Sequence, residues 1–219
     1  METIEQFTVR RSSRARRVRV RVEPDGSLLV TLPQAARASE ADDAIEQLEG
    51  WIASRRANLL RARSVVARPD GTLPYLGELL TVSEQPGRTS AHRSGDELLV
   101  PADARSERAI ERWYRRSAKA EVIERLAPAL SALAVKAGSV SIRDQRTRWG
   151  SCSSSGALSF NWRLLLGPRE LLDYVVWHEA CHLVVLDHSP RFWALLEQHQ
   201  PDYRAPRDWL RRNGSALSL

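Results

Sequence analysis

The sequence has little cysteine, almost no lysine and no long apolar run. Its two cysteines, Cys152 and Cys181, are too few for the disulfide framework of a small secreted protein. No window approaches the roughly 18 consecutive apolar residues of a membrane-spanning helix. Residues 1–6 are acidic and polar and lack the apolar region of a secretory signal. These absences predict a cytoplasmic protein that does not engage a membrane.

The basic residues are almost all arginine, whereas the net charge is modest. Of the 33 basic residues, 31 are arginine and 2 are lysine, and the formal net charge is +6. Such a ratio indicates a genome-wide coding bias more than selection for nucleic-acid binding, and any basic protein retains anions non-specifically. No specific nucleic acid is therefore predicted. The arginines from Arg10 to Arg21 are interpreted as a solvated strand face with a basic loop, and an anion contact is the alternative.

Composition is otherwise that of a soluble globular protein, with 42% hydrophobic and 27% charged residues. A length of 219 residues allows one large domain or two small ones. No internal repeat or low-complexity segment is visible.

The N-terminal half alternates strand and helix patterns. Alternating valines before a Pro24–Ser27 turn signal predict a β-hairpin over residues 7–32. A helix is expected from Ser39, as its N-cap, with an apolar stripe of Ile45, Leu48, Trp51, Ile52 and Leu59. Strands are expected at 79–82 and 98–100.

The central stretch predicts a long amphipathic helix. Apolar residues recur at helical spacing from Ser106 to about Ala134, and Pro128 is expected to kink the helix or divide it into two. The neighbouring Trp113 and Tyr114 are interpreted as core residues.

The C-terminal part begins with two predicted strands, over 139–143 and 158–162, separated by a turn at 153–156. Pro168 is placed at the first position of the next helix. A further helix is expected to restart with Ser189 as N-cap and Pro190 at its first position.

The first of these helices carries His178, Glu179 and His182. Histidines four residues apart lie one turn above each other, so both imidazoles can bind one metal ion. The glutamate between them can reach a metal-activated water without being a ligand, as in the H-E-x-x-H helix of zinc hydrolases. Leu171 and Val175 precede the histidines on the same face, which is typical of a rigid and partly dry site. A buried helix with two hydrogen-bonded structural histidines is the competing interpretation.

A catalytic zinc ion needs a third protein ligand. The candidates downstream are His188, Glu197 and His199. His188 precedes the second helix in a bend that can fold it over the first pair, and Asp187 beside it could orient a ligand histidine. Cys152 and Cys181 are interpreted as packed structural residues.

Several motifs in order resemble one known family. They are Arg148–Ser153 (usual form W-G-S-C-S), Asn161–Leu164 (N-W-R-L), Tyr174–Leu183 (H-E-L-C-H-L) and Asp187–Trp193 (N-H-S-x-x-F-W). This set resembles the YgjP-like zinc metallopeptidases, related to the SprT-like and WLM groups, and a looser likeness covers most of the chain. The departures are Ala180 for leucine and Asp187 for asparagine, and neither removes a ligand.

The resemblance implies an α+β fold with a zincin-like C-terminal core, in which a small β-sheet lies beside the H-E-x-x-H helix. It implies that His178, His182 and His188 bind Zn²⁺ and that Glu179 is the general base. A metzincin is excluded, because Val185 replaces the metzincin glycine and the one methionine is Met1. Two regions are expected: a β-rich N-terminal region with one helix over 1–102, linked by helices to the core over 103–219.

The main functional hypothesis is a zinc metallopeptidase acting on peptides or proteins, with a strand over 158–163 aligning the substrate by β-augmentation. Tyr203 and Arg148 are the candidates for the group that stabilises the oxyanion. A metal-dependent nucleoside triphosphate pyrophosphatase, an activity proposed within the family, is the alternative, although no Walker-type glycine loop is present. A third hypothesis is a nucleic-acid-associated binding module. The sequence does not indicate an oligomeric state.

Overall fold

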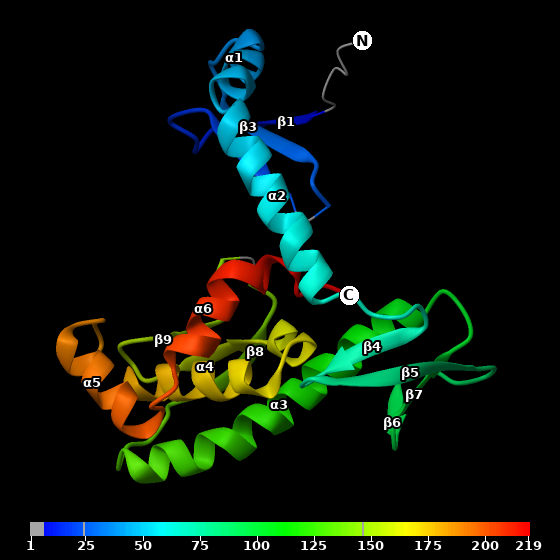
Figure 1. Ribbon diagram of the computed structural model, residues 1–219, viewed down its shortest axis with the longest axis vertical. Coiled ribbons are helices and arrows are strands. Elements are labelled where there is room, and N and C mark those ends of the chain that lie inside the picture. The colour runs from blue at the N-terminus through cyan, green and yellow to red at the C-terminus, as the bar shows by residue number, and fades with distance from the viewer. Residues whose placement is uncertain (1–6, 24, 146) are drawn as a thin grey trace. The chain divides into compact units, whose positions relative to one another are not determined.

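A computed structural model describes residues 7–23, 25–145 and 147–219. Within these ranges the chain forms six α-helices and three small β-sheets (Figure 1), which confirms the α+β class. No helix in the described ranges has both the length and the apolar character needed to span a membrane. The chain divides into two compact units, Met1–Ala67 with Arg212–Ala216 and Arg68–Arg211 with Leu217–Leu219.

A three-stranded sheet forms the base of the first unit. β2 (Arg19–Val22) and β3 (Leu28–Pro33) pair antiparallel, and β1 (Phe7–Ser12) lies parallel to β3 on its other edge. The hairpin is confirmed in β2 and β3, whereas β1 is a separate strand that the sequence pattern did not resolve. Within the turn, the Asp25 carboxylate accepts hydrogen bonds from the Ser27 amide and hydroxyl. Pro24, part of the predicted turn, lies outside the described residues.

The register of this sheet separates its two faces. Arg10, Thr31 and Arg19 are paired across the three strands, one position after the Val30–Val20 pair. Since side chains alternate along a strand, the two arginines lie on the face opposite the valines. Both arginines are exposed, and Val30 is completely buried. This agrees with a solvated arginine face, and an anion contact stays a prediction.

Two helices follow where one was predicted. α1 (Ser39–Gln47) and α2 (Glu49–Val65) are divided at Leu48, whose φ of −106° and ψ of 10° are not helical. The expected cap was wrong, since Ala38 is the N-cap and makes no side-chain bond, whereas Glu40 accepts a hydrogen bond from the Arg37 amide. The predicted stripe holds only in part, because Trp51 is 47% exposed. One buried cluster of this unit consists of Val30, Leu32 and Ala41, and it is lined by the partly buried Phe7, Val18, Val20, Ala36 and Ile45.

The second unit opens with a four-stranded sheet in the order β4-β5-β7-β6. Its strands are β4 (Thr72–Tyr75), β5 (Glu78–Gln85), β6 (His92–Ser94) and β7 (Glu97–Pro101). The strands predicted at 79–82 and 98–100 are confirmed within β5 and β7. The hairpin between β4 and β5 turns at Leu76 and Gly77, with φ of 52° and 92°. The second value is one that glycine adopts at little cost.

α3 (Ser106–Ala132) is the long helix predicted for the centre of the chain (Figure 1). Pro128 does not divide it into two helices, because the helix continues through this residue to Ala132, and the alternative of a kink stays a prediction. Pro128 lies close to the C-terminal end, so it interrupts the hydrogen-bond ladder only where the ladder is about to end. Trp113 and Tyr114 are buried, at 7% and 0% exposed, as their interpretation as core residues required.

Hydrogen bonds connect the four-stranded sheet to the rest of the second unit. The Tyr114 hydroxyl donates to the carbonyl of Pro74 in β4, and the Leu76 amide donates to the carbonyl of Leu165 at 2.8 Å. The boundary expected at residues 102/103 thus falls inside this unit, where β7 leads into α3. The extent of independently folding domains stays a prediction.

The H-E-x-x-H helix is α4 (Arg169–Cys181), and a third sheet precedes it in the chain. β8 (Val140–Arg143), β9 (Gly150–Cys152) and β10 (Leu158–Asn161) form a sheet in the order β8-β10-β9, with β8 parallel and β9 antiparallel to β10. α4 contacts α3, β9 and β10. The other elements are η1 (Trp162–Leu166), α5 (Pro190–His199), α6 (Arg204–Asn213) and η2 (Gly214–Ala216).

Two predictions for this region need correction and one is confirmed. Pro168 is the N-cap of α4 and not its first residue, with an extended ψ of 148°. β10 is paired along both edges, so a substrate cannot add to the strand predicted over 158–163. α5 begins as expected, with Ser189 as N-cap and proline at its first position.

Candidate metal centre

One face of α4 leads from the core to the candidate site. Leu171 and Val175 are 2% and 3% exposed, and His178 and His182 follow on the same side of the helix. The chain then leaves α4, turns, and brings His188 back before α5. This turn is held by the Asp187 carboxylate, which accepts a hydrogen bond of 3.0 Å from the Ser189 amide.

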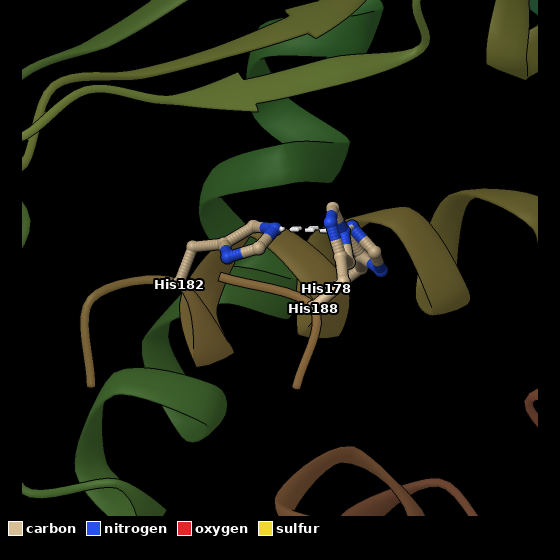
Figure 2. Close-up of side chains that lie close together, drawn as sticks. All are labelled: His178, His182 and His188. Carbon is tan, nitrogen blue, oxygen red and sulfur yellow. Dashed lines mark hydrogen bonds between the residues drawn. The ribbon is translucent and has the colours of Figure 1, made fainter. Parts of the chain in front are cut away.

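The three histidines converge on one point (Figure 2). Their Nε2 atoms are 3.2 Å apart for His178 and His182, 3.2 Å for His182 and His188, and 3.0 Å for His178 and His188. In a tetrahedral site with metal–nitrogen bonds of about 2.0–2.1 Å, ligand nitrogens are about 3.3–3.4 Å apart. The triangle therefore has the size that one small metal ion requires.

The protonation of these rings favours a cation between them. Nδ1 of His182 lies 3.0 Å from the carbonyl of Val185, which can only accept, so this nitrogen carries the proton and Nε2 offers a lone pair. Burial, followed by the neighbouring histidines and Arg207, lowers the pKa of His178 to about 3. Burial also lowers the pKa of His182. Neutral imidazoles whose lone pairs point at one another repel, and a cation bound between them would stabilise this arrangement.

Aromatic rings fix the orientation of the imidazoles. Phe192 of α5 is completely buried, and its ring stacks on His182 with centroids 4.4 Å apart. Trp193 stacks on His188 at 5.5 Å. The Phe-Trp pair of the last sequence motif thus forms a wall against which the rings are held.

Glu179 is a buried residue whose carboxylate has no hydrogen-bond partner among the described residues. It is 5% exposed, and no donor in the described ranges reaches its oxygens. Burial raises the pKa of Glu179 to about 8, and the charge of Arg148 acts in the opposite direction. Buried polar groups normally have a partner, and an unpaired one in a cleft with a shifted pKa is typical of a functional site.

Glycine at position 150 gives Glu179 its space. A Cβ atom on Gly150 would lie 2.5 Å from Oε1 of Glu179, far inside van der Waals contact. The strand β9 therefore packs directly on the carboxylate. Together with Trp149, Tyr174, Val175, His178 and three residues of α6, these two residues line a pocket of about 290 Å³.

A family model described as "YgjP-like, metallopeptidase domain" matches residues 16–213. The chain belongs to this family. A metallopeptidase family implies a hydrolase with a metal cofactor and peptide or protein substrates. The YgjP-like resemblance found in the sequence is confirmed.

Comparisons of this YgjP-like chain with curated proteins and with solved structures give less similarity. Among curated proteins none matches it. The crystal structure of the metallopeptidase zymogen of Pyrococcus abyssi abylysin is similar at 25% identity and a TM-score of 0.36, over 42% of this chain and 90% of that chain.

Two of the three candidates for the third ligand lie elsewhere in the YgjP-like fold. Glu197 forms an ion pair of 2.7 Å with Arg204 on the protein surface. His199 stacks on Trp177, with centroids 4.8 Å apart. Among the candidates, His188 is the one whose nitrogen lies beside His178 and His182.

The two cysteines and Tyr203 have structural surroundings. Burial raises the pKa of Cys181 to about 12, and burial followed by the charge of Glu179 raises that of Cys152. Among the described residues, none stabilises either thiol as a thiolate in the way that a catalytic cysteine requires. Tyr203 is buried and stacks on Trp193, and it does not line the pocket beside Glu179.

The sequence interpretation missed two contributions to the site. β9 and its close approach to Glu179 were not predicted, although the W-G-S-C-S motif contains Gly150. α6 was not predicted either, and it brings Arg207, Leu210 and Arg211 to the pocket. The amphipathic spacing of residues 204–213 was a signal for this helix.

Proposed function

We propose that this chain is a zinc metallopeptidase of zincin-like architecture, with His178, His182 and His188 as ligands and Glu179 as general base. The observation that carries the proposal is the triangle of Nε2 atoms, 3.0–3.2 Å on a side, beside a pocket that His178 and the buried Glu179 both line. The sheet β8-β10-β9 beside α4 is consistent with such a core.

Three imidazoles suit zinc. Imidazole nitrogen is a preferred ligand of Zn²⁺, and three protein ligands leave the fourth tetrahedral position open, as catalytic sites require. When bound, zinc would supply Lewis-acid activation of water and polarise the scissile carbonyl.

Glu179 would move the proton. It takes a proton from the attacking water and then delivers it to the leaving amine. Burial raises its pKa to about 8 when no cation is bound, and a cation beside it would lower that value, which favours the ionised carboxylate that accepts the proton. A group poised in this way can both accept and return a proton near pH 7.

The open edge of β9 would align the substrate. The Asn161 amide donates to the carbonyl of Trp149, and the Ser153 amide donates to the carbonyl of Ala157. The backbone groups of the odd-numbered residues of β9 and its flanks therefore face β10. In an antiparallel ladder the backbone groups of Gly150 and Cys152 then point away from β10, toward the free edge. An extended peptide pairing there would lie beside Glu179, which packs on Gly150.

A nucleoside triphosphate is the second candidate substrate. The observation that favours it is the pair of guanidinium groups of Arg207 and Arg211 in the pocket lining. Such groups bind phosphate as well as carboxylate. A nucleic-acid-binding role rests on charge alone, and the cytoplasmic location stays a prediction.

The experiment compares the wild type with Glu179→Gln. Both are purified without added metal, analysed for zinc, and assayed on unfolded proteins, peptides and nucleoside triphosphates. We expect one zinc per chain in both and peptide cleavage only in the wild type. Wild-type protein without zinc near neutral pH would contradict the metal site. Triphosphate turnover that Glu179→Gln abolishes, without peptide cleavage, would replace the peptidase by the second candidate.

A further inference from the structure

α6 contributes two arginines to the lining of the pocket beside His178. Arg207 and Arg211 are four residues apart, so they lie on the same face of the helix. Both line the pocket of about 290 Å³ that Glu179 and His178 also line. The pocket therefore has positive charge on the wall that α6 contributes.

Arg207 is the more available of the two cations. Its guanidinium carbon lies 4.4 Å from the ring centroid of Trp193, and no carboxylate of the described ranges forms an ion pair with it. Arg211 pairs with Asp208 at 3.2 Å. Because Trp193 itself stacks on His188, the guanidinium of Arg207 is supported by the same aromatic wall as the metal centre.

The rest of the lining fits a short acidic chain. Val175 and Leu210 provide apolar contact for methylene groups, and Trp149 adds a flat surface. A guanidinium binds a carboxylate through two parallel hydrogen bonds, and it carries no acceptor for a basic group. Glu179 lines the part of the pocket formed by α4 and β9, so a substrate carboxylate would bind at the α6 side, beside the arginines.

We propose that this pocket is a subsite for a carboxylate of the substrate next to the cleaved bond, with Arg207 as the specificity-determining residue and Arg211 in support. This inference rests on the proposed peptidase function. The carboxylate can come from an acidic side chain or from the C-terminus of the peptide.

The test uses the zinc-loaded full-length protein and peptides that differ only by Glu or Gln at each position flanking the cleaved bond. A parallel pair carries a free or an amidated C-terminus and separates the two sources of the carboxylate. For the wild type we expect kcat/KM to favour the acidic member of a pair by about fivefold or more, which is the scale of one partly exposed guanidinium–carboxylate pair.

Three variants show whether Arg207 sets this preference. Arg207→Gln should reduce the ratio to about one, and Arg207→Lys should retain part of it because the charge remains. Arg204→Gln is the matched control, since Arg204 is on the same helix but pairs with Glu197 and does not line the pocket. The ratio is used because loss of Arg207 also removes a contact on Trp193 and can slow cleavage of every peptide.

Failure of the carboxylate subsite and failure of the proposed peptidase function give different results in these assays. Equal cleavage of acidic and neutral peptides by the wild type, or a preference that survives in Arg207→Gln, overturns the subsite and leaves the peptidase intact. No peptide cleavage by zinc-loaded protein overturns both. If nucleoside triphosphates are turned over and this activity depends on Arg207, the pocket binds phosphate, and the proposal of a carboxylate subsite is overturned.

Discussion

Gly150 and Glu179 are in such close contact that no side chain fits between them. A Cβ atom on Gly150 would lie 2.5 Å from Oε1, 2.6 Å from Cγ and 2.8 Å from Cδ of Glu179. All three distances are shorter than van der Waals contact, and the carboxylate cannot retreat easily because it is 5% exposed. The glycine therefore determines where the proposed general base can lie.

Gly150→Ala should impair catalysis without removing the metal. The new methyl group would displace the Glu179 carboxylate, and a misplacement of this size can cost about 100-fold in rate. Zinc content should stay at the wild-type level, because the three heavy atoms nearest to the new methyl group all belong to Glu179 and none to a histidine. The measurements are kcat on a cleavable peptide and the zinc content of the purified variant.

Gly50→Ala is the matched control. Gly50 lies in the first turn of α2, and a Cβ atom there would meet nothing within 4 Å. We expect unchanged kcat and a melting temperature equal to or slightly above that of the wild type, since alanine favours a helix over glycine by roughly 0.5–1 kcal/mol. Full activity in Gly150→Ala would show that Glu179 is not the base or that it moves freely.

His188→Ala should abolish tight zinc binding. Two imidazoles would remain of the three that converge within 3.2 Å, and affinity should fall by more than about 100-fold, since even loss of a residue that only supports a ligand costs roughly 10–100-fold. The measurement is competition with a chromogenic chelator. His199→Ala is the control, because that ring stacks on Trp177 away from the cluster and should leave zinc affinity unchanged. If His199→Ala lost zinc and His188→Ala kept it, the third ligand would be His199.

The sequence predicted the part of the site that depends on local geometry. His178 and His182 are one helical turn apart, and this spacing follows from the helix alone. Their glutamate and the apolar lead-in of Leu171 and Val175 follow from the same periodicity. The bend that returns His188 was predicted from a serine and a proline that start the next helix, and the structure has that start.

The remaining features depend on contacts between distant segments. The approach of Gly150 to Glu179 joins a strand to a helix 29 residues later (179 − 150), and no periodicity encodes it. Arg207 reaches the pocket because α6 returns to α4, which a single sequence does not reveal. Pro128 was overestimated as a helix breaker because its effect depends on how much helix follows, and only four residues do (132 − 128).

Asp144→Asn should destabilise the fold at neutral pH but not in acid. Asp144 accepts a hydrogen bond of 2.7 Å from Nε of Arg163, which holds its pKa below the ordinary 3.8, and burial acts in the opposite direction. A lowered pKa in the fold gives stability that is present above about pH 4 and is lost as the pH falls through the folded-state value. We expect a loss of roughly 0.5–1 kcal/mol at pH 7, since the pair is partly exposed.

The measurement is urea unfolding of wild type and Asp144→Asn between pH 7 and pH 3. The two curves of unfolding free energy against pH should converge at the acid end. Asp43→Asn is the control, because Asp43 is exposed and forms no ion pair with a described residue, and it should not differ from the wild type. A constant difference at all pH values would mean that Asp144 contributes through its shape and not through its charge.

Cys152→Pro tests the open edge of β9. The Cys152 amide points away from β10, so proline there should spare the sheet while removing a donor for the substrate. Loss of one backbone hydrogen bond should raise KM by roughly 2–12-fold, the equivalent of about 0.5–1.5 kcal/mol, with kcat and zinc content unchanged. Cys152→Ala keeps the amide and should behave as the wild type, which separates the backbone from the thiol. If both variants raise KM equally, the side chain and not the strand edge contacts the substrate. An unchanged KM in both would place the peptide away from β9.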